Sequence, residues 1–136
     1  MNENTEILLD CKSISKYFKE GENILKVIDS MDFQLPKCVV GVIRGSSGAG
    51  KSTLLHLLGG LDTPTKGDIF FKGKNLSSLS SKELDVYRLT KVGFVFQFHH
   101  LLPEFTLLEN VLLPAQILNG KRKEDEDRAK ELIAAV

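Results

Sequence analysis

A nine-residue stretch, Gly45-Ser46-Ser47-Gly48-Ala49-Gly50-Lys51-Ser52-Thr53, constrains this chain more than any other feature. It fits the pattern G-x-x-x-x-G-K-[ST] of a phosphate-binding loop. An apolar run, 38–43, precedes it, and a leucine-rich run, 54–58, follows it. These flanks predict that the loop joins a buried strand to a helix, which is the setting of such a loop. We call residues 45–53 the phosphate loop.

The residue types in the phosphate loop suit the binding of a polyphosphate. Its three glycines allow backbone conformations closed to other residues and remove the Cβ atoms that would keep amide N–H groups from a phosphate. A helix that begins near Lys51 adds a partial positive charge at its N-terminus. Lys51 would reach the phosphate oxygens, and the Ser52 hydroxyl is placed to bind Mg²⁺. The alternative is a glycine-rich turn that holds no ligand.

Composition limits the classes of protein to which the chain can belong. Its 136 residues suffice for one domain or part of one, and the apolar content of 42% with 26% charged residues is that of a globular protein. Lys plus Arg and Asp plus Glu number 18 each. A broad electrostatic attraction to nucleic acid or to an anionic membrane is therefore not indicated.

Three further features argue against a zinc or disulfide scaffold, a signal peptide and a membrane-spanning segment. Cys11 and Cys38 form no C-x-x-C pair and have no matching set of histidines, so neither a zinc site nor a disulfide scaffold is suggested, and a reducing cytosol fits best. The first six residues are polar and acidic, unlike a signal peptide. No apolar run approaches the roughly 20 residues that span a bilayer. We therefore expect any membrane role to come through a partner.

Hydrophobic periodicity predicts strands and helices in a definite order. Strands are expected over 7–18, 24–35, 38–43, 68–73 and 92–96, the third of them buried on both faces. Helices are expected over 53–60, buried on most sides, and over 81–89 and 107–118. Ser80 with Glu83, and Thr106 with Glu109, fit the capping-box pattern at the starts of the last two helices. The segment 121–136 is typical of an exposed charged helix, with Glu124 and Arg128 four residues apart.

Tyr17 and a histidine pair leave alternatives open. Tyr17 is either a core residue of its strand or an exposed aromatic platform before the turn at 19–22. His99 and His100 lie in an apolar, aromatic loop, 98–105, which Pro103 keeps from being helical. Adjacent residues point in different directions, and His56 is the only other histidine. We therefore favour a loop that contacts another molecule over a two-histidine metal site.

The order of these features resembles the first half of an ABC-transporter ATPase subunit. Tyr17 comes first, then the phosphate loop, then Val92-Gly93-Phe94-Val95-Phe96-Gln97, and then Leu101-Leu102-Pro103 and Glu109-Asn110-Val111. The runs 54–62 (LLHLLGGLD) and 97–105 (QFHHLLPEF) are similar to the ATP-binding subunit of the bacterial lipoprotein-releasing system, within a broader exporter group. The resemblance extends from about residue 7 to residue 119.

The resemblance implies an α/β fold: a partial P-loop ATPase core with an N-terminal antiparallel β subdomain and the start of a helical subdomain. Residues 1–97 would form the nucleotide-binding core, which includes the N-terminal β subdomain and the phosphate loop. Residues 98–136 would contain the end of the loop that begins at Gln97, called the glutamine loop, and the beginning of the helical subdomain. ATP and Mg²⁺ are the implied cofactors. The implied cofactor-binding residues are Tyr17, Gly45, Ser46, Ser47, Gly48, Ala49, Gly50, Lys51, Ser52, Thr53 and Gln97.

The family pattern also implies individual roles and partners. Tyr17 matches the aromatic residue that stacks on adenine, Ser52 and Gln97 match positions that bind Mg²⁺, and Lys51 and Gln97 contribute to catalysis. The loop after Gln97 is the part that meets integral membrane subunits, which would explain an exposed aromatic cluster. A second ATPase subunit is the other implied partner, and nucleic acid is not one. The implied location is peripheral, on the cytoplasmic face of the bacterial inner membrane.

The sequence departs from the family pattern in two ways. Cys38-Val39 replaces the usual Gly-Glu pair and Arg44 replaces an aliphatic residue, so we expect the strand before the phosphate loop to differ locally. The signature Ser-Gly-Gly motif, the acidic magnesium strand with its catalytic glutamate, and the switch histidine do not occur in the 136 residues. We therefore expect a truncated portion of an ATPase that binds nucleotide without sustaining hydrolysis.

Three other functions fit parts of the sequence. The chain could belong to an exporter of peptides, drugs or macrolides, because no substrate pocket is identifiable in it. It could also be a non-catalytic P-loop nucleotide-binding module, or a small P-loop kinase. A kinase needs an acceptor site and a lid with arginines, and after Gly50 the chain has only Arg88, Arg122 and Arg128.

Overall fold

An antiparallel hairpin of two long strands, β1 (Ile7–Glu20) and β2 (Asn23–Pro36), begins the fold in the computed structural model. The structure describes residues 6–98 and 100–136, which form two compact units, Met1–Arg88 and Leu89–Val136. The predicted strands over 7–18 and 24–35 are confirmed, and each is slightly longer than predicted. The functional division predicted between residues 97 and 98 stays a prediction.

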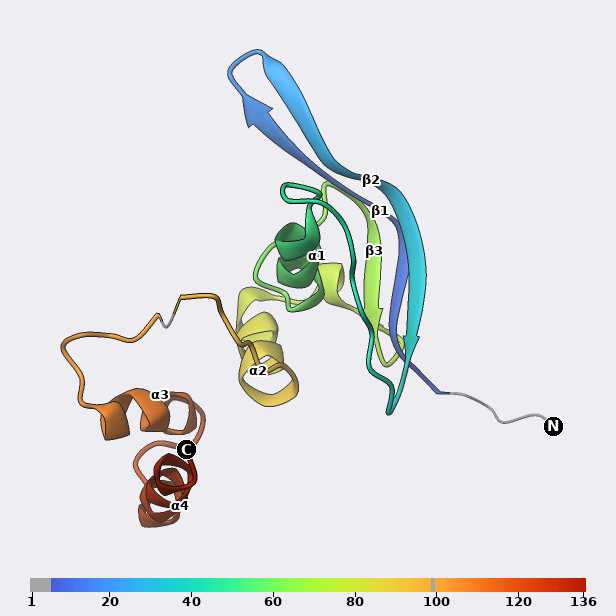
Figure 1. Cartoon of the computed structure of the whole chain (residues 1–136). Coiled ribbons are helices and arrows are strands. Elements are labelled where there is room, and N and C mark those ends of the chain that lie inside the picture. The colour runs from blue at the N-terminus through green and yellow to red at the C-terminus, as the bar shows by residue number, and fades with distance from the viewer. Residues whose placement is uncertain (1–5, 99) are drawn as a thin grey trace. The chain divides into compact units, whose positions relative to one another are not determined.

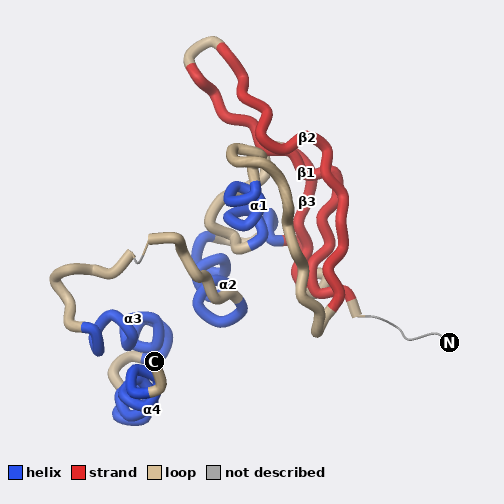
Figure 2. The backbone as a smooth tube through the Cα atoms, viewed as in Figure 1, coloured by secondary structure: helices blue, strands red, loops and turns tan. Residues whose placement is uncertain are grey.

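Strand β1 lies inside a four-stranded antiparallel sheet whose order is β2-β1-β3-β4 (Figures 1 and 2). Strand β3 (Lys66–Phe71) pairs with β1 only between Leu9 and Ser15, and the short β4 (Lys74–Asn75) pairs with the end of β3. The tip of the β1–β2 hairpin therefore extends past the other two strands (Figure 1). This arrangement confirms the predicted N-terminal antiparallel β subdomain.

A bulge in β1 sets the shape of this sheet. Ser13 has φ +47°, and the register of β1 with both β2 and β3 shifts around it. Gly67 of β3 lies against the bulge: a Cβ at Gly67 would stand 2.3 Å from the carbonyl oxygen of Ser13 and 2.4 Å from that of Lys12. Only glycine lets β3 approach so closely, because any side chain would overlap this backbone.

Helix α1 (Lys51–Leu58) lies on one face of the sheet (Figure 1) and forms the core of the first unit with it. The buried apolar residues of this unit are Cys11, Ile14, Ile28, Leu54, Leu57, Ile69, Leu76 and Tyr87. We predict a helix buried on most sides, but Leu55 is 50% exposed. The predicted burial on most sides is wrong, because a sheet packed on one side of a helix covers only one face of it.

Helix α2 (Ser81–Lys91) follows a short 3₁₀ turn, η1 (Leu76–Ser78), and holds the C-terminal end of α1. The Tyr87 hydroxyl donates to the Leu58 carbonyl oxygen at 2.9 Å, and the Arg88 guanidinium donates to the Gly60 carbonyl oxygen. The first bond satisfies a carbonyl group that the end of a helix leaves without an intrahelical partner, and the second holds the turn that follows the helix. The C-terminal end of α1 is therefore fixed by side chains of α2.

The predicted capping box at the start of α2 is confirmed. The Glu83 carboxylate accepts hydrogen bonds from both the backbone N–H and the hydroxyl of Ser80, each at 2.9 Å. These bonds, with a smaller effect from Lys74, lower the pKa of Glu83 to about 2. A carboxylate at this end of a helix also interacts favourably with the helix dipole.

Two apolar segments that we predict as strands are not strands. Residues 39–46 and 92–96 lie outside helices and strands, and Val40, Val42 and Val95 are 92%, 72% and 102% exposed. A strand that is buried on both faces needs hydrogen-bonded neighbours within a covered sheet. In the part of the chain that the structure describes, the one sheet consists of β1 to β4, and neither segment joins it. Their apolar side chains therefore stay exposed.

The second unit contains two helices that pack together, α3 (Leu107–Asn119) and α4 (Lys123–Ala134). The Thr106–Glu109 capping box is confirmed in both directions, and so are the two predicted helices. Leu112 of α3 and Ala129 of α4 are buried. The charged helical surface predicted for 121–136 is present on α4, where Glu126 pairs with Lys130 and Arg128 pairs with Glu131.

The contact between Gly67 and the β1 bulge yields a stability prediction. Both Gly67 and Gly73 have φ +78°, but a Cβ at Gly73 meets nothing within 4 Å. Gly73→Ala should therefore cost only backbone strain, about 1 kcal/mol. Gly67→Ala adds overlap with the β1 backbone and should lower the free energy of unfolding by about 3 kcal/mol or more.

Urea unfolding of both variants beside the unchanged chain measures this difference directly. Equal losses for the two substitutions would show that β3 does not depend on its close approach to Ser13.

Candidate nucleotide-binding site

The phosphate loop leads directly into helix α1, as predicted. Gly48 and Gly50 have φ +79° and +85°, and Gly50 is the N-cap residue of α1. No side chain caps this helix and its first turn contains no acidic residue. The backbone donors and the positive end of the helix dipole are therefore left for an anion from outside the loop.

The side chain of Lys51 folds back over the phosphate loop. Its Nζ donates to the carbonyl oxygens of Gly45 at 3.0 Å and Ser46 at 2.6 Å. The ammonium group is thus held at the loop by weak, exposed acceptors that phosphate oxygens could replace. A phosphate oxygen carries negative charge and a carbonyl oxygen does not, so an ammonium group binds phosphate more strongly.

Two glycines of the loop differ in what surrounds them. A Cβ at Gly50 would lie 2.9 Å from Val27 Cγ1 and 3.0 Å from the Val27 carbonyl oxygen, so Gly50 seats the loop against β2. A Cβ at Gly48 would meet nothing within 4 Å. The loop is therefore anchored on one side and open on the other, which fits a polyphosphate lying over Gly48.

Ser52 is the residue of the loop that fits a magnesium ion. It is exposed in the first turn of α1, next to Lys51, and its hydroxyl is a suitable oxygen ligand. In residues 6–98 and 100–136, no group of three or more His, Cys, Asp or Glu side chains is arranged to hold a metal ion. The predicted role of Ser52 at Mg²⁺ stays a prediction.

Tyr17 lies half-buried in β1, in the same unit as the phosphate loop. Its partner in the β1–β2 ladder is Lys26, and the next residue of β2, Val27, is the one that contacts Gly50. Tyr17 and the loop therefore meet the same short stretch of β2. The predicted role of Tyr17 at adenine stays a prediction.

The side chain of Tyr17 is held by the carboxylate of Asp29, which the sequence did not indicate as a site residue. The Tyr17 hydroxyl donates to Asp29 Oδ1 at 2.6 Å, and this bond, ahead of the nearby Lys26, lowers the pKa of Asp29. The Nζ atoms of Lys26 and Lys66 lie 5.5 Å and 6.0 Å from the centroid of the Tyr17 ring. The only signal in the sequence was that Asp29 interrupts the alternation of its strand.

Gln97 belongs to the second unit and is exposed, outside helices and strands. Beside it, the rings of Phe94 and Phe96 stack with centroids 5.2 Å apart, and the His100 ring contacts Phe96 edge-on at 4.8 Å. The proposed contact of Gln97 with Mg²⁺ stays a prediction. His99, the other member of the histidine pair, lies outside the described residues.

The loop after Gln97 exposes apolar side chains, as predicted, and Pro103 lies outside any helix. Phe98, Leu101 and Phe105 are 71%, 58% and 43% exposed. The side chain of Asn110, which the sequence did not indicate as important, has three hydrogen-bond contacts with this loop and one with the cap residue Thr106. Its position one residue after the capping box gave no signal of this role.

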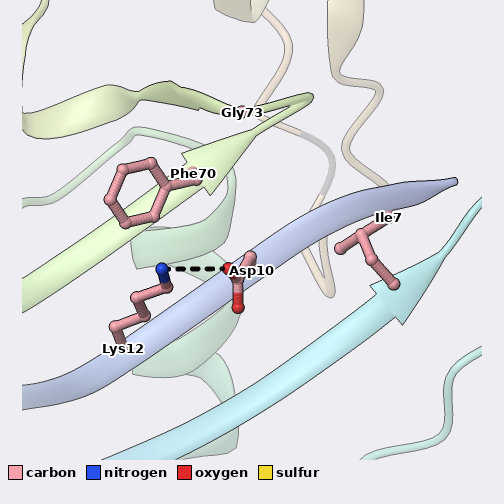
Figure 3. Close-up of a pocket in the computed structure, with 5 residues that line it drawn as sticks. All are labelled: Ile7, Asp10, Lys12, Phe70 and Gly73. Carbon is pink, nitrogen blue, oxygen red and sulfur yellow. Dashed lines mark ion pairs between the residues drawn. The ribbon is translucent and has the colours of Figure 1, made fainter.

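A hollow of about 270 Å³ lies elsewhere on the first unit, lined by Ile7, Asp10, Lys12, Phe70 and Gly73 (Figure 3). Lys12 Nζ is 3.6 Å from the Asp10 carboxylate and 5.0 Å from the centroid of the Phe70 ring. Phe70 follows the buried Ile69, so alternation along β3 places the hollow on the face away from the core. Its charges are paired with each other, and we assign it no role.

Among the helices of the described residues, none combines the length and the apolar character needed to cross a membrane.

Comparisons with known proteins show the family to which the chain belongs. A sequence profile of the ABC transporter family matches residues 28–136. The chain is also similar to the ATP-binding cassette MJ0796 in a dimeric post-hydrolysis state bound to ADP and Pi, with 33% identity and a TM-score of 0.74. A second dimeric structure of MJ0796, a bacterial ABC transporter cassette, matches with 32% identity and a TM-score of 0.74. Each match covers 91% of this chain and 55% of the other chain.

Proposed function

Because the chain belongs to the ABC transporter family, we propose that it is the ATP-binding part of a transporter's ATPase subunit and holds ATP on the phosphate loop. One observation carries this proposal: helix α1 begins without a side-chain cap or an acidic residue, directly after an open glycine loop over which Lys51 is folded. This is an arrangement of donors and positive charge without an anion of its own.

Each predicted residue has a task in this proposal. The amides around Gly48 and Gly50 donate to the phosphates, while Lys51 leaves its carbonyl partners and binds phosphate oxygens. Tyr17 stacks on adenine, and Ser52 with Gln97 holds Mg²⁺, which when bound neutralises charge on the phosphates. Supporting this, the open space at Gly48 and the exposed Ser52 lie at the same end of α1.

We propose that the 136 residues alone bind nucleotide without sustained hydrolysis. The sequence contains no signature Ser-Gly-Gly motif, no acidic magnesium strand with a catalytic glutamate, and no switch histidine. Phosphoryl transfer depends on a positioned water and on charge stabilisation around the γ-phosphate, and these groups would provide both. The chain spans only 55% of the MJ0796 chain that it matches.

The proposed parent subunit acts as a dimer that drives a membrane subunit. The dimeric state of the MJ0796 cassettes supports the first part. The exposed Phe98, Leu101 and Phe105 support the second, because an apolar loop of this kind is covered by a partner. The subunit would then be peripheral, on the cytoplasmic face of the bacterial inner membrane.

We further propose that the transporter releases lipoproteins from the inner membrane. This rests on the runs 54–62 and 97–105, which resemble the lipoprotein-releasing system. The alternatives are another ABC exporter, of the peptide, drug or macrolide type, and a non-catalytic P-loop module. Co-purification with a membrane subunit of the lipoprotein-releasing type is the expected result; a stable complex with a drug or peptide exporter instead would refute the assignment.

Titration of the chain with ATP and Mg²⁺ by calorimetry tests nucleotide binding. Replacing Lys51 with alanine removes the cation at the phosphates and should weaken binding about tenfold or more. Lys82→Ala is the matched control, because Lys82 is exposed on α2 and no partner is found for it among the described residues. The control should bind ATP as the unchanged chain does.

Two results would contradict the proposal. An equal affinity for ATP in the Lys51→Ala and Lys82→Ala variants would remove the phosphate loop from nucleotide binding. Sustained ATP turnover by the 136 residues, abolished by Lys51→Ala, would show that the chain carries a complete catalytic site.

A further inference from the structure

One side chain organises the loop that follows Gln97. Asn110 Oδ1 accepts a hydrogen bond from the Leu102 N–H at 2.9 Å. The two N–H groups of Asn110 Nδ2 are shared among three carbonyl oxygens, those of Leu102 at 3.1 Å, Phe105 at 3.1 Å and Thr106 at 3.0 Å. A single amide group thus joins backbone atoms that are up to eight residues distant from it in sequence.

The chemistry of these partners fixes the residue type. The acceptor end of the amide meets an N–H, and its donor end meets carbonyl oxygens. Turning the amide over would place its oxygen against three carbonyl oxygens, so this network determines the orientation. Aspartate is nearly the same shape but has no donor when ionised, and leucine has neither a donor nor an acceptor.

Asn110 acts separately from the cap of α3. The capping box consists of Thr106 and Glu109, which bond each other's backbone N–H groups. The side chain of Asn110 bonds no N–H of the helix; its partners are the loop and the carbonyl of the cap residue. The helix therefore keeps its own start without Asn110, whereas the loop loses its main link to the helix.

The held segment presents apolar side chains to solvent. Leu101, Leu102 and Phe105 are 58%, 40% and 43% exposed, and the Phe105 N–H donates to the Leu102 carbonyl oxygen at 3.1 Å to close a turn. A loop that is ordered before binding loses less conformational entropy when it meets its partner. Order at this place would otherwise be unexpected, because exposed loops have few buried contacts to hold them.

We propose that Asn110 is a positioning residue that fixes residues 102–106, so that Leu101, Leu102 and Phe105 form a preformed apolar contact for the membrane subunit. The identity of the partner rests on the proposed function, whereas the order of the loop does not. The loop can therefore be tested on the 136-residue chain by itself.

Amide hydrogen exchange, followed by NMR on the ¹⁵N-labelled chain, tests the inference. In the unchanged chain, the side-chain NH₂ protons of Asn110 should exchange more slowly than those of Asn119, which is exposed at the end of α3. Asn110→Asp should lower the protection of the Leu102 and Phe105 amides about tenfold or more, and leave that of Leu112 within α3 unchanged.

Asn119→Asp is the matched control, because it makes the same chemical change on the same helix. A negative charge in the first turn favours a helix and one in the last turn opposes it. Helix-dipole effects alone would therefore make Asn119→Asp the more damaging substitution. Loss of loop protection in Asn110→Asp, with the helical circular dichroism signal retained, supports the positioning role.

Some outcomes would contradict the positioning role of Asn110, and a different outcome would contradict the proposed function. Fast exchange of the Asn110 side chain, or equal loop protection in the two aspartate variants, overturns the positioning role. If Asn110→Asp also unfolds α3, the test rests on exchange of the Asn110 side-chain NH₂ protons in the unchanged chain. Slow exchange then supports the positioning role, and fast exchange contradicts it. A protected loop in a chain that binds neither ATP nor a membrane subunit would overturn the proposed function and leave the role of Asn110 standing.

Discussion

The contact between Gly50 and Val27 is the constraint on which the candidate site depends. The phosphate loop packs so closely against β2 at this point that a Cβ at Gly50 would lie 3.0 Å from the Val27 carbonyl oxygen. The same stretch of β2 pairs with Tyr17, and Asp29 two residues later binds the Tyr17 hydroxyl. The antiparallel sheet therefore does more than cover one side of α1, because it fixes the start of the helix relative to the aromatic residue proposed for adenine.

Elements whose causes are local could be predicted from the sequence. The two capping boxes, the start of a helix at the end of the phosphate loop, and the two hairpin strands depend mainly on residues that are close in sequence, and these elements are confirmed. Phosphate binding by the loop stays a prediction. The segments 38–43 and 92–96 have the composition of buried strands, but a strand also needs a partner. Among the described residues, neither segment has a partner strand in the sheet. The prediction was wrong because it rested on composition alone. The roles of Asp29 and Asn110 could not be predicted because no sequence pattern marks their partners, which only the folded backbone brings within hydrogen-bond distance.

The two units divide the proposed functions between them. The first contains the phosphate loop, Tyr17 and the sheet, and the second contains Gln97, the apolar loop and helices α3 and α4. The proposed nucleotide binding by Lys51 and the proposed contact with a membrane subunit through Leu101 and Phe105 use residues of different units, and the proposed Mg²⁺ ligand Gln97 belongs to the second unit. An ABC transporter ATPase has to couple them, and Gln97 lies in the chain between the two sets of residues.

The most direct measurement of the central claim is the response of the phosphate-loop amides to nucleotide. In ¹H–¹⁵N spectra of the chain titrated with ATP and Mg²⁺, the resonances of Gly48, Gly50 and Ser52 should shift saturably. Those of Gly73 and Gly120, glycines with φ +78° and +72° outside the loop, should stay in place. Unmoved loop resonances at saturating ATP, or shifts confined to other residues, would contradict the assignment of residues 45–53 as the nucleotide site.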